Sequence, residues 1–187
     1  MIFLKYVMLL ILFVLANVIG RILSQKYVYR LEELNEIKSF LNIFKTKIRF
    51  TCDTIPEIFQ EFAEKTKKNL GKMFLRANEK MSTKTAGQAW ESALDESKAE
   101  LNLKEEDLNV MKMLAKMLGN TDLEWQISQI EITEKFLDIQ IKQAKEEKDK
   151  NQKLYQKLGT TIGLGIVILL IWISLKFKDR KECCYGY

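Results

Sequence analysis

The sequence predicts an all-α protein, in which a helical bundle of about six helices lies between two transmembrane helices. Three observations lead to this prediction. Apolar runs occupy both ends of the chain, apolar residues between them recur every three or four positions, and the 187 residues include a single proline. Sheets with many tight turns need glycine and proline at those turns, so this composition disfavours a β fold.

Residues 2–23 form the first predicted transmembrane helix. Residues 6–15 are apolar without interruption. A helix rises about 1.5 Å per residue, so roughly 20 apolar residues cross a hydrocarbon core about 30 Å thick. A secretory signal peptide is the alternative, but Ala16-Asn17-Val18 is a poor match to a small-residue cleavage site. We therefore expect an uncleaved anchor.

Residues 158–175 form the second predicted transmembrane helix and contain no charged residue. Trp172 near the far end and Tyr155 just before the start are aromatic anchors of the kind found at headgroup depth. Gly163 and Gly165 could let another helix approach closely, although glycine is also common in spans without such a role.

Two spans place both termini on one side of the membrane and the soluble helical domain, residues 24–157, on the other. Lysine and arginine near the spans are in excess on the domain side, which the positive-inside rule assigns to the cytoplasm. The basic tail, residues 176–187, argues for the opposite orientation. The formal net charge of +5 is explained by these residues beside the membrane, where anionic lipid attracts them.

The first part of the domain predicts two helices in succession. Residues 25–50 carry the apolar stripe of an amphipathic helix, which consists of Leu31, Leu34, Ile37, Leu41, Phe44 and Ile48. Thr54 and Glu57 have the spacing of a capping box, and Pro56 is tolerated in a first helical turn. A second helix therefore begins near residue 55.

The second part of the domain predicts the remaining helices. Residues 70–81 form a weaker helix interrupted by Gly71, and Ser82 is a plausible cap for the helix that follows. Residues 103–118 form the next helix, which Gly119 ends. Thr121 and Glu124 supply another capping box, and from residue 123 no glycine or proline occurs before Gly159. We expect this last helix to run unbroken into the second span.

Composition and motifs give no support to an enzyme. The chain has no histidine, which excludes histidine-based triads and metal sites. Cys52, Cys183 and Cys184 lack the spacing of a zinc site or disulfide framework, and Cys52 fits a small buried apolar group. No glycine-rich phosphate loop, nucleophile elbow or arginine cluster with aromatics occurs. We expect no catalytic, cofactor or metal site, no small-molecule substrate and no nucleic-acid partner.

Three features are candidate sites with simpler structural explanations. The acidic cluster Glu105, Glu106 and Asp107 could serve acid–base chemistry, but complementing a helix dipole explains it better. Asp122 and Gln126 lie one turn apart and form either a recognition patch or local contacts at a helix start. Trp90 is expected to anchor the core, since it brings a large apolar area.

Two patterns carry a family resemblance. The first is LGxxDxxxQ at residues 118–126 and the second is KLYxxLGxxxGL at residues 153–164. Together with the rest of the chain they resemble the stage III sporulation protein AB family of endospore-forming bacteria. The residues singled out by this resemblance, as structural or partner-facing, are Trp90, Leu118, Gly119, Asp122, Gln126, Tyr155, Leu158 and Gly159. Lys47 stands where the family would be expected to have a glutamate.

The resemblance implies a domain similar to the cytoplasmic helical domains of F-class platform proteins of type II secretion. It implies membership of a secretion-like channel complex in the double membrane between mother cell and forespore. The expected partners are a companion secretion-type ATPase and other channel proteins. The expected location is the mother-cell membrane around the forespore, with the domain in the cytoplasm. The residues alone also allow a two-span membrane sensor or regulator that signals through its long helix.

Overall fold

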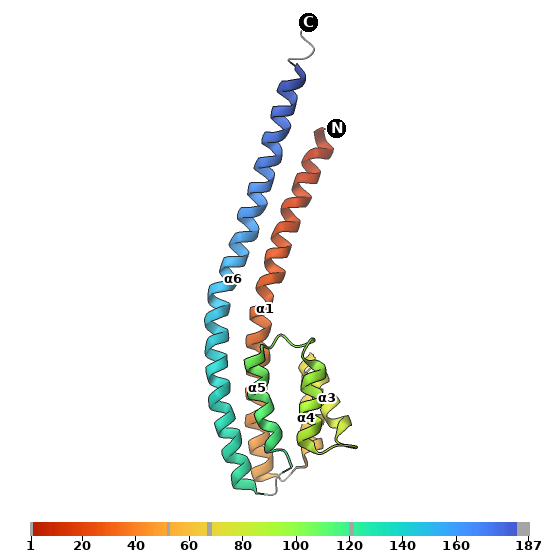
Figure 1. Ribbon diagram of the computed structural model, residues 1–187, viewed down its shortest axis with the longest axis vertical. Helices are drawn as coiled ribbons and strands as arrows, with labels where there is room; N and C mark the ends of the chain where they lie inside the picture. The colour runs from red at the N-terminus through yellow and green to blue at the C-terminus, as the bar shows by residue number, and fades with distance from the viewer. Residues whose placement is uncertain (1, 52, 67–68, 120–121, 183–187) are drawn as a thin grey trace. The chain divides into compact units, whose positions relative to one another are not determined.

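The computed structural model describes residues 2–51, 53–66, 69–119 and 122–182, and these residues contain helices and no strand. Cys52, Thr121, Cys183 and Cys184 lie outside the described residues. The all-α prediction is confirmed. The elements, labelled in Figure 1, are α1 (Ile2–Phe50), α2 (Ile55–Lys65), α3 (Asn69–Lys80), α4 (Ala86–Ser97), α5 (Glu105–Met113), the 3₁₀ turn η1 (Leu114–Lys116) and α6 (Leu123–Glu182).

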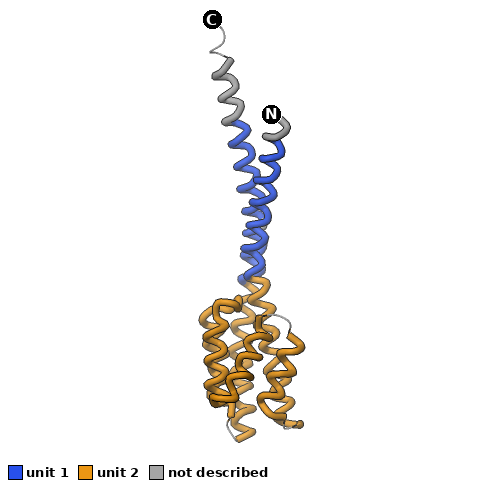
Figure 2. Tube along the Cα trace, turned by 90° about the vertical axis from the view of Figure 1, so that its right-hand side faces the viewer, with its two compact units in different colours: residues 1–26, 147–187 blue, residues 27–146 orange. Residues whose placement is uncertain are grey.

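The chain forms two compact units, which Figure 2 colours separately. The domain unit consists of residues 27–146, and the span unit consists of residues 1–26 and 147–187. The helices α1 and α6 each contribute residues to both units. The predicted limits of the membrane segments, 2–23 and 158–175, remain predictions, because they concern a lipid boundary rather than a division of the chain.

In the domain unit, α3 packs against α2 and α4, while α1 and α6 run antiparallel beside each other. Two ion pairs join these long helices. The Lys38 ammonium lies 2.5 Å from the Asp138 carboxylate, and the Lys45 ammonium lies 2.8 Å from the Glu134 carboxylate. As the α1 residue number rises, its α6 partner's number falls, which fixes the antiparallel direction.

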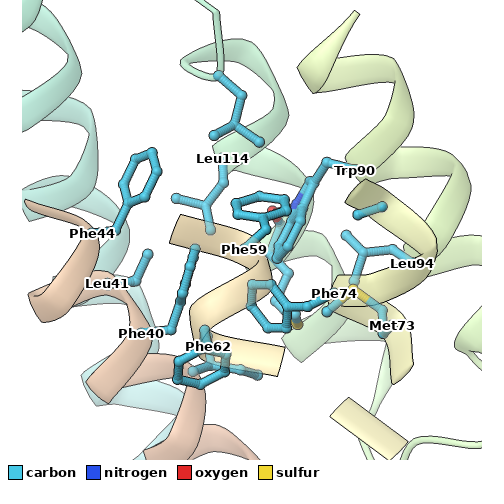
Figure 3. Close-up of a cluster of buried hydrophobic side chains, with 14 of the residues drawn as sticks. Phe40, Leu41, Phe44, Phe59, Phe62, Met73, Phe74, Trp90, Leu94 and Leu114 are labelled. Atoms are coloured by element: carbon cyan, nitrogen blue, oxygen red, sulfur yellow. The ribbon is translucent and has the colours of Figure 1, made fainter. Parts of the chain in front are cut away.

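An aromatic cluster lies at the centre of the domain unit (Figure 3). The ring centroids of Phe40 and Phe74 are 4.5 Å apart, and those of Phe74 and Trp90 are 5.3 Å apart. Phe59 meets Phe74 edge-on at 5.2 Å. These distances are within the range preferred by interacting aromatic pairs. The predicted stripe of the first helix is buried as expected, with Leu31 partly buried at its edge.

Helix starts were predicted with mixed success. The Thr54 backbone N–H donates to the Glu57 carboxylate at 2.9 Å, which confirms the predicted start of α2. The predicted cap of α4 was wrong. Thr85, rather than Ser82, caps this helix, because the Thr85 hydroxyl oxygen accepts a hydrogen bond from the Gln88 backbone N–H. The Ser82 hydroxyl instead donates to the Glu79 carbonyl at 2.7 Å and closes the end of α3.

Two predictions about helix continuity were also wrong. Gly71 does not interrupt a helix but lies within α3, where a Cβ atom would sit 1.9 Å from the Thr66 carbonyl oxygen. The residue is therefore required by a close backbone approach. The predicted helix 103–118 is shorter, since α5 ends at Met113 and a 3₁₀ turn follows.

Two helices, α1 and α6, are long and apolar enough to cross a membrane by length and composition. In the span unit large apolar side chains point outward, and Leu10 and Ile168 expose 65% and 64% of their surface. Lipid tails are as apolar as these side chains, so exposing them to lipid carries no hydrophobic free-energy penalty. The prediction that the last helix continues without a break into the second apolar segment is confirmed.

Candidate functional site

The residues singled out from the sequence lie in three separate places. Trp90 belongs to the aromatic cluster and is fully buried. Its indole Nε1–H donates to the Met111 carbonyl oxygen at 2.8 Å, which joins α4 to α5. A buried indole without a partner would be costly, so this hydrogen bond explains how a tryptophan fits in an apolar core. Trp90 is thus a core anchor, as expected.

The second place is the turn before α6. Leu118 is buried, and Gly119 has a φ of 89°, a left-handed conformation that favours glycine. The Asp122 carboxylate accepts hydrogen bonds from the backbone N–H groups of Glu124 and Trp125. Asp122 therefore caps α6, which agrees with the local explanation of this residue.

Gln126 lies one turn into α6, where its backbone N–H donates to the Asp122 carbonyl oxygen at 3.0 Å. Its side chain is partly buried. The pair Asp122 and Gln126 is brought together by a helix start, so the recognition-patch alternative is not needed to account for it.

The third place is a helix crossing in the span unit. A Cβ atom on Gly159 would lie 3.1 Å from the Ala16 carbonyl oxygen and 3.3 Å from the Gly20 Cα atom. A Cβ atom on Gly20 would lie 2.8 Å from the Tyr155 carbonyl oxygen. The two backbones therefore meet at Gly20 and Gly159, and any larger side chain there would force them apart.

Other contacts extend this crossing along both helices. Gly163 packs against the Phe13 ring, while Gly165 has nothing within 4 Å of an added Cβ atom. The close approach considered for the two glycines is therefore made by Gly163 alone. The Thr160 hydroxyl donates to the Asn17 amide oxygen at 2.9 Å, a polar contact between the same helices. Leu158 lies on the outer surface, 43% exposed.

A buried ion pair was missed by the sequence analysis. Arg30 on α1 donates from Nε and Nη2 to the two Asp107 carboxylate oxygens at 2.8 and 2.9 Å, and their side chains are 4% and 0% exposed. Asp107 also accepts from the Lys104 N–H at 2.8 Å, which caps α5. Arg30 further donates to the Gln140 amide oxygen at 3.4 Å. One guanidinium thus joins α1, α5 and α6.

Only the capping part of this arrangement had a signal in the sequence. Three acidic residues at a predicted helix start indicate dipole complementation, which Asp107 does provide. Its pairing with Arg30 joins positions far apart in the chain. No local spacing predicts such a pair.

A small polar pocket lies along the same stretch of α1 that carries Arg30. The Glu33 carboxylate accepts from the backbone N–H and the side-chain amide of Asn102, both at 2.8 Å. A pocket of 290 Å³ is lined by Tyr29, Glu32, Glu33, Asn69 and Asn102. Its carboxylates favour cationic over anionic groups. Within the part of the chain that is described, no group of three or more histidine, cysteine, aspartate and glutamate residues is placed to hold a metal.

Lys47, the residue that departs from the family expectation, contributes to the domain's own structure. Its ammonium lies 2.6 Å from both the Asp53 and the Glu61 carboxylates. Hydrogen bonds to these carboxylates raise the pKa of Lys47. Hydrogen bonds from Lys47 lower the pKa of Asp53 and the pKa of Glu61. The lysine therefore fastens α1 to α2 and its preceding loop.

Comparisons with known proteins agree with this fold. The model of the stage III sporulation protein AB family matches residues 5–171. Among solved structures, a stage III sporulation protein AB is similar over 64% of this chain and 96% of its own, with a TM-score of 0.61 and 19% identity. At that identity the likeness shows the fold alone. No curated protein matches the sequence. Because the family match includes the whole domain unit and most of the span unit, the chain belongs to the stage III sporulation protein AB family.

Proposed function

We propose that this protein is a membrane-anchored platform component of the channel complex between mother cell and forespore, and that its helical domain docks a secretion-type ATPase. The observation that carries the proposal is the family match over residues 5–171. Under this proposal the protein acts by assembly, and the buried Arg30–Asp107 pair and the Glu33–Asn102 hydrogen bonds serve to hold the domain together.

The domain unit is suited to hold a shape against a partner. Its aromatic cluster is fully buried, and the Arg30–Asp107 pair fixes three helices to one another. Burial of this kind gives a packed interior with little freedom to rearrange. Platform proteins need such rigidity, because they position a second protein relative to a membrane.

The family-signature residues maintain this shape under the proposal. Trp90 fills the core, Gly119 and Asp122 form the turn into α6, and Gly159 allows the helix crossing. Partner contacts are then made by exposed residues outside the signature.

The proposed location is the mother-cell membrane that surrounds the forespore, with the domain in the cytoplasm. The lysine and arginine excess beside the spans on the domain side supports this orientation. Single cysteines at Leu75, which is exposed on α3, and at the native Cys183 report the two sides in a chain whose other cysteines are serine. A membrane-impermeant thiol reagent added outside intact vegetative cells that express the chain should label Cys183 and spare the cysteine at Leu75. The reverse labelling would contradict the orientation.

The docking itself is tested with the full chain, carrying an affinity tag and purified in mild detergent from sporulating cells. Channel-complex proteins that include an ATPase should co-purify. A Trp90→Ala variant provides the matched control, because it disrupts the domain core while leaving the span unit unchanged. Loss of the ATPase from this variant is expected. Absence of the ATPase from the folded wild-type protein would refute the docking, and its retention by the variant would place the contact in the spans.

A further inference from the structure

The surface of α6 has a cavity at the point where the second apolar segment begins. The cavity has a volume of 440 Å³ and is lined by Lys153, Lys157, Thr160 and Thr161. The two lysines are four residues apart, and the threonines follow three and four residues after the second lysine, so the four side chains share one face of the helix. All four are exposed. The cavity is therefore open to whatever surrounds the span unit.

The hydrogen-bond donors that the cavity offers to a ligand are lysine ammonium groups. The Thr160 hydroxyl donates to the Asn17 amide oxygen at 2.9 Å, and the Thr161 hydroxyl donates to the Lys157 carbonyl oxygen at 3.0 Å. Both hydroxyl protons are thus used within the protein. Each ammonium carries a full positive charge and three donors. This set of donors fits an anion.

The sequence around the cavity is rich in cations and poor in carboxylates. No aspartate or glutamate occurs in residues 150–178, and none occurs in residues 1–31. The nearest acidic residue before the cavity is Asp149, which lies one helical turn from Lys153 on the side away from the apolar segment. None of the positions three or four residues from Lys157 is acidic, so its own helix supplies no neighbouring carboxylate to that lysine.

A third cation lies at the same level on α1. The backbone of α1 approaches α6 at Gly20, where a Cβ atom would lie 2.8 Å from the Tyr155 carbonyl oxygen and 3.1 Å from the Gly159 Cα atom. Lys157 is midway between these two α6 residues, and Arg21 directly follows Gly20. Arg21 and Lys157 therefore share one level of the span unit, and both helices attract an anion to it.

This level coincides with the ends of the two predicted spans. The first predicted span ends at residue 23 and the second begins at residue 158, in the two helices that are long and apolar enough to cross a membrane. Phospholipid headgroups lie at the ends of a span, and basic pockets at this depth bind anionic headgroups. A zwitterionic headgroup carries a cation of its own, which the lysines repel. Anionic lipid is therefore the ligand that the charges favour.

We propose that the cavity binds the phosphate group of an anionic phospholipid, such as phosphatidylglycerol, through the ammonium groups of Lys153 and Lys157. The threonine hydroxyls are engaged within the protein, so the lipid is selected by its charge rather than by hydroxyl groups on its headgroup. The inference rests on the membrane anchoring contained in the proposed function, but it is independent of ATPase docking.

Native mass spectrometry of the full chain tests the binding. The protein in mild detergent is titrated with phosphatidylglycerol and, in parallel, with phosphatidylcholine that has the same acyl chains. The protein should retain one phosphatidylglycerol molecule more tightly than phosphatidylcholine, and equal retention of the two lipids would overturn the proposal. A large excess of inorganic phosphate should not displace the lipid, because the acyl chains add to its binding. Displacement would assign the cavity to a free anion and would also overturn the proposal.

Two double variants separate the cavity from diffuse positive charge. Lys153→Gln with Lys157→Gln should weaken phosphatidylglycerol binding roughly 25-fold, since each lysine near an anionic surface contributes about fivefold. Lys142→Gln with Lys145→Gln is the matched control, because these exposed lysines lie on α6 more than three helical turns before residue 158. The control should bind as the wild type does. Circular dichroism should show that both variants remain folded, since all four lysines are exposed. Equal losses in the two variants, or no loss in the first, would overturn the proposal.

Extraction of membranes with alkaline carbonate separates failure of the lipid site from failure of the anchoring. The wild-type chain should stay in the membrane fraction. Its release would overturn the membrane anchoring and the lipid site together. A chain that resists extraction but shows no preference for phosphatidylglycerol would overturn the lipid site alone.

Discussion

The domain unit and the span unit are packed by opposite means. In the domain unit the largest side chains lie inside, where Phe40, Phe74 and Trp90 are in contact. In the span unit the smallest residues lie inside, because Gly20 and Gly159 meet backbone to backbone, while leucine and isoleucine side chains point outward.

This difference matches the packing expected of one unit in water and another in lipid. Water drives apolar surface together, so a domain in water gains by burying large aromatic side chains. Lipid tails are as apolar as leucine, so helices in a membrane associate through close packing and polar contacts instead. The close backbone approach at Gly20 and Gly159 is therefore of the kind expected between helices in lipid.

The largest expected effect is in the aromatic cluster. Trp90→Ala should cost the domain roughly 3–5 kcal/mol, because it leaves a large cavity and also deprives the Met111 carbonyl of its donor. Chemical unfolding followed by circular dichroism of the full chain in detergent measures this loss. Phe50→Ala is the control, since Phe50 is 74% exposed, and it should leave stability nearly unchanged. Similar losses for both variants would show that the cluster does not hold the domain together.

The buried ion pair should give the next largest effect. Asp107→Ala leaves the Arg30 guanidinium buried without its carboxylate, which should destabilise the domain by about 3 kcal/mol. The double variant Arg30→Met with Asp107→Leu should recover part of that loss, because it removes both charges. Glu96→Ala, which breaks an exposed pair with Lys80, should change stability by less than about 1 kcal/mol. A double variant less stable than Asp107→Ala would contradict this account.

The helix crossing is tested by adding bulk at one glycine. Gly159→Leu should separate the two helices at a cost of roughly 2 kcal/mol, because the backbone of α1 leaves no room for a side chain. Disulfide formation between cysteines placed at Asn17 and Thr160 reports the separation in a chain whose native cysteines are serine. Gly165→Leu is the matched control, since nothing lies within 4 Å of its Cβ position. Equal disulfide yields in both variants would argue against the crossing.

The smallest expected effect concerns the polar contact between the spans. A double-mutant cycle with Asn17→Leu and Thr160→Val isolates the hydrogen bond between these side chains. Interhelical hydrogen bonds in membranes contribute about 0.6 kcal/mol on average, and we expect a coupling of that size. Unfolding of the full chain in lipid bicelles measures it. A coupling above about 2 kcal/mol would mean that polar contacts, rather than close packing, hold the spans together.

Features governed by short-range rules were predictable from the sequence. The start of α2 followed from Thr54 and Glu57, and the turn at Gly119 followed from the preference of left-handed backbone for glycine. The buried stripe of α1 followed from helical periodicity. In each case the determining residues lie within one or two turns of one another.

Features that depend on tertiary contact were not predictable in the same way. Gly71 resembled a helix breaker, although the nearby Thr66 carbonyl makes it necessary inside α3. The Arg30–Asp107 pair and the Gly20–Gly159 crossing join residues that are distant in sequence. Ser82 and Thr85 both have side chains able to cap a helix, and only the position of α4 distinguishes them.

The closure of the domain by α6 has a consequence for biosynthesis. Ile130 and Leu137 of α6 are fully buried in the core that the earlier helices begin. A ribosome delivers the chain from its N-terminus, so the part of the core that Ile130 and Leu137 cover stays exposed until residues 123–146 have emerged. A nascent chain stalled before that point therefore exposes apolar surface that a chaperone can bind.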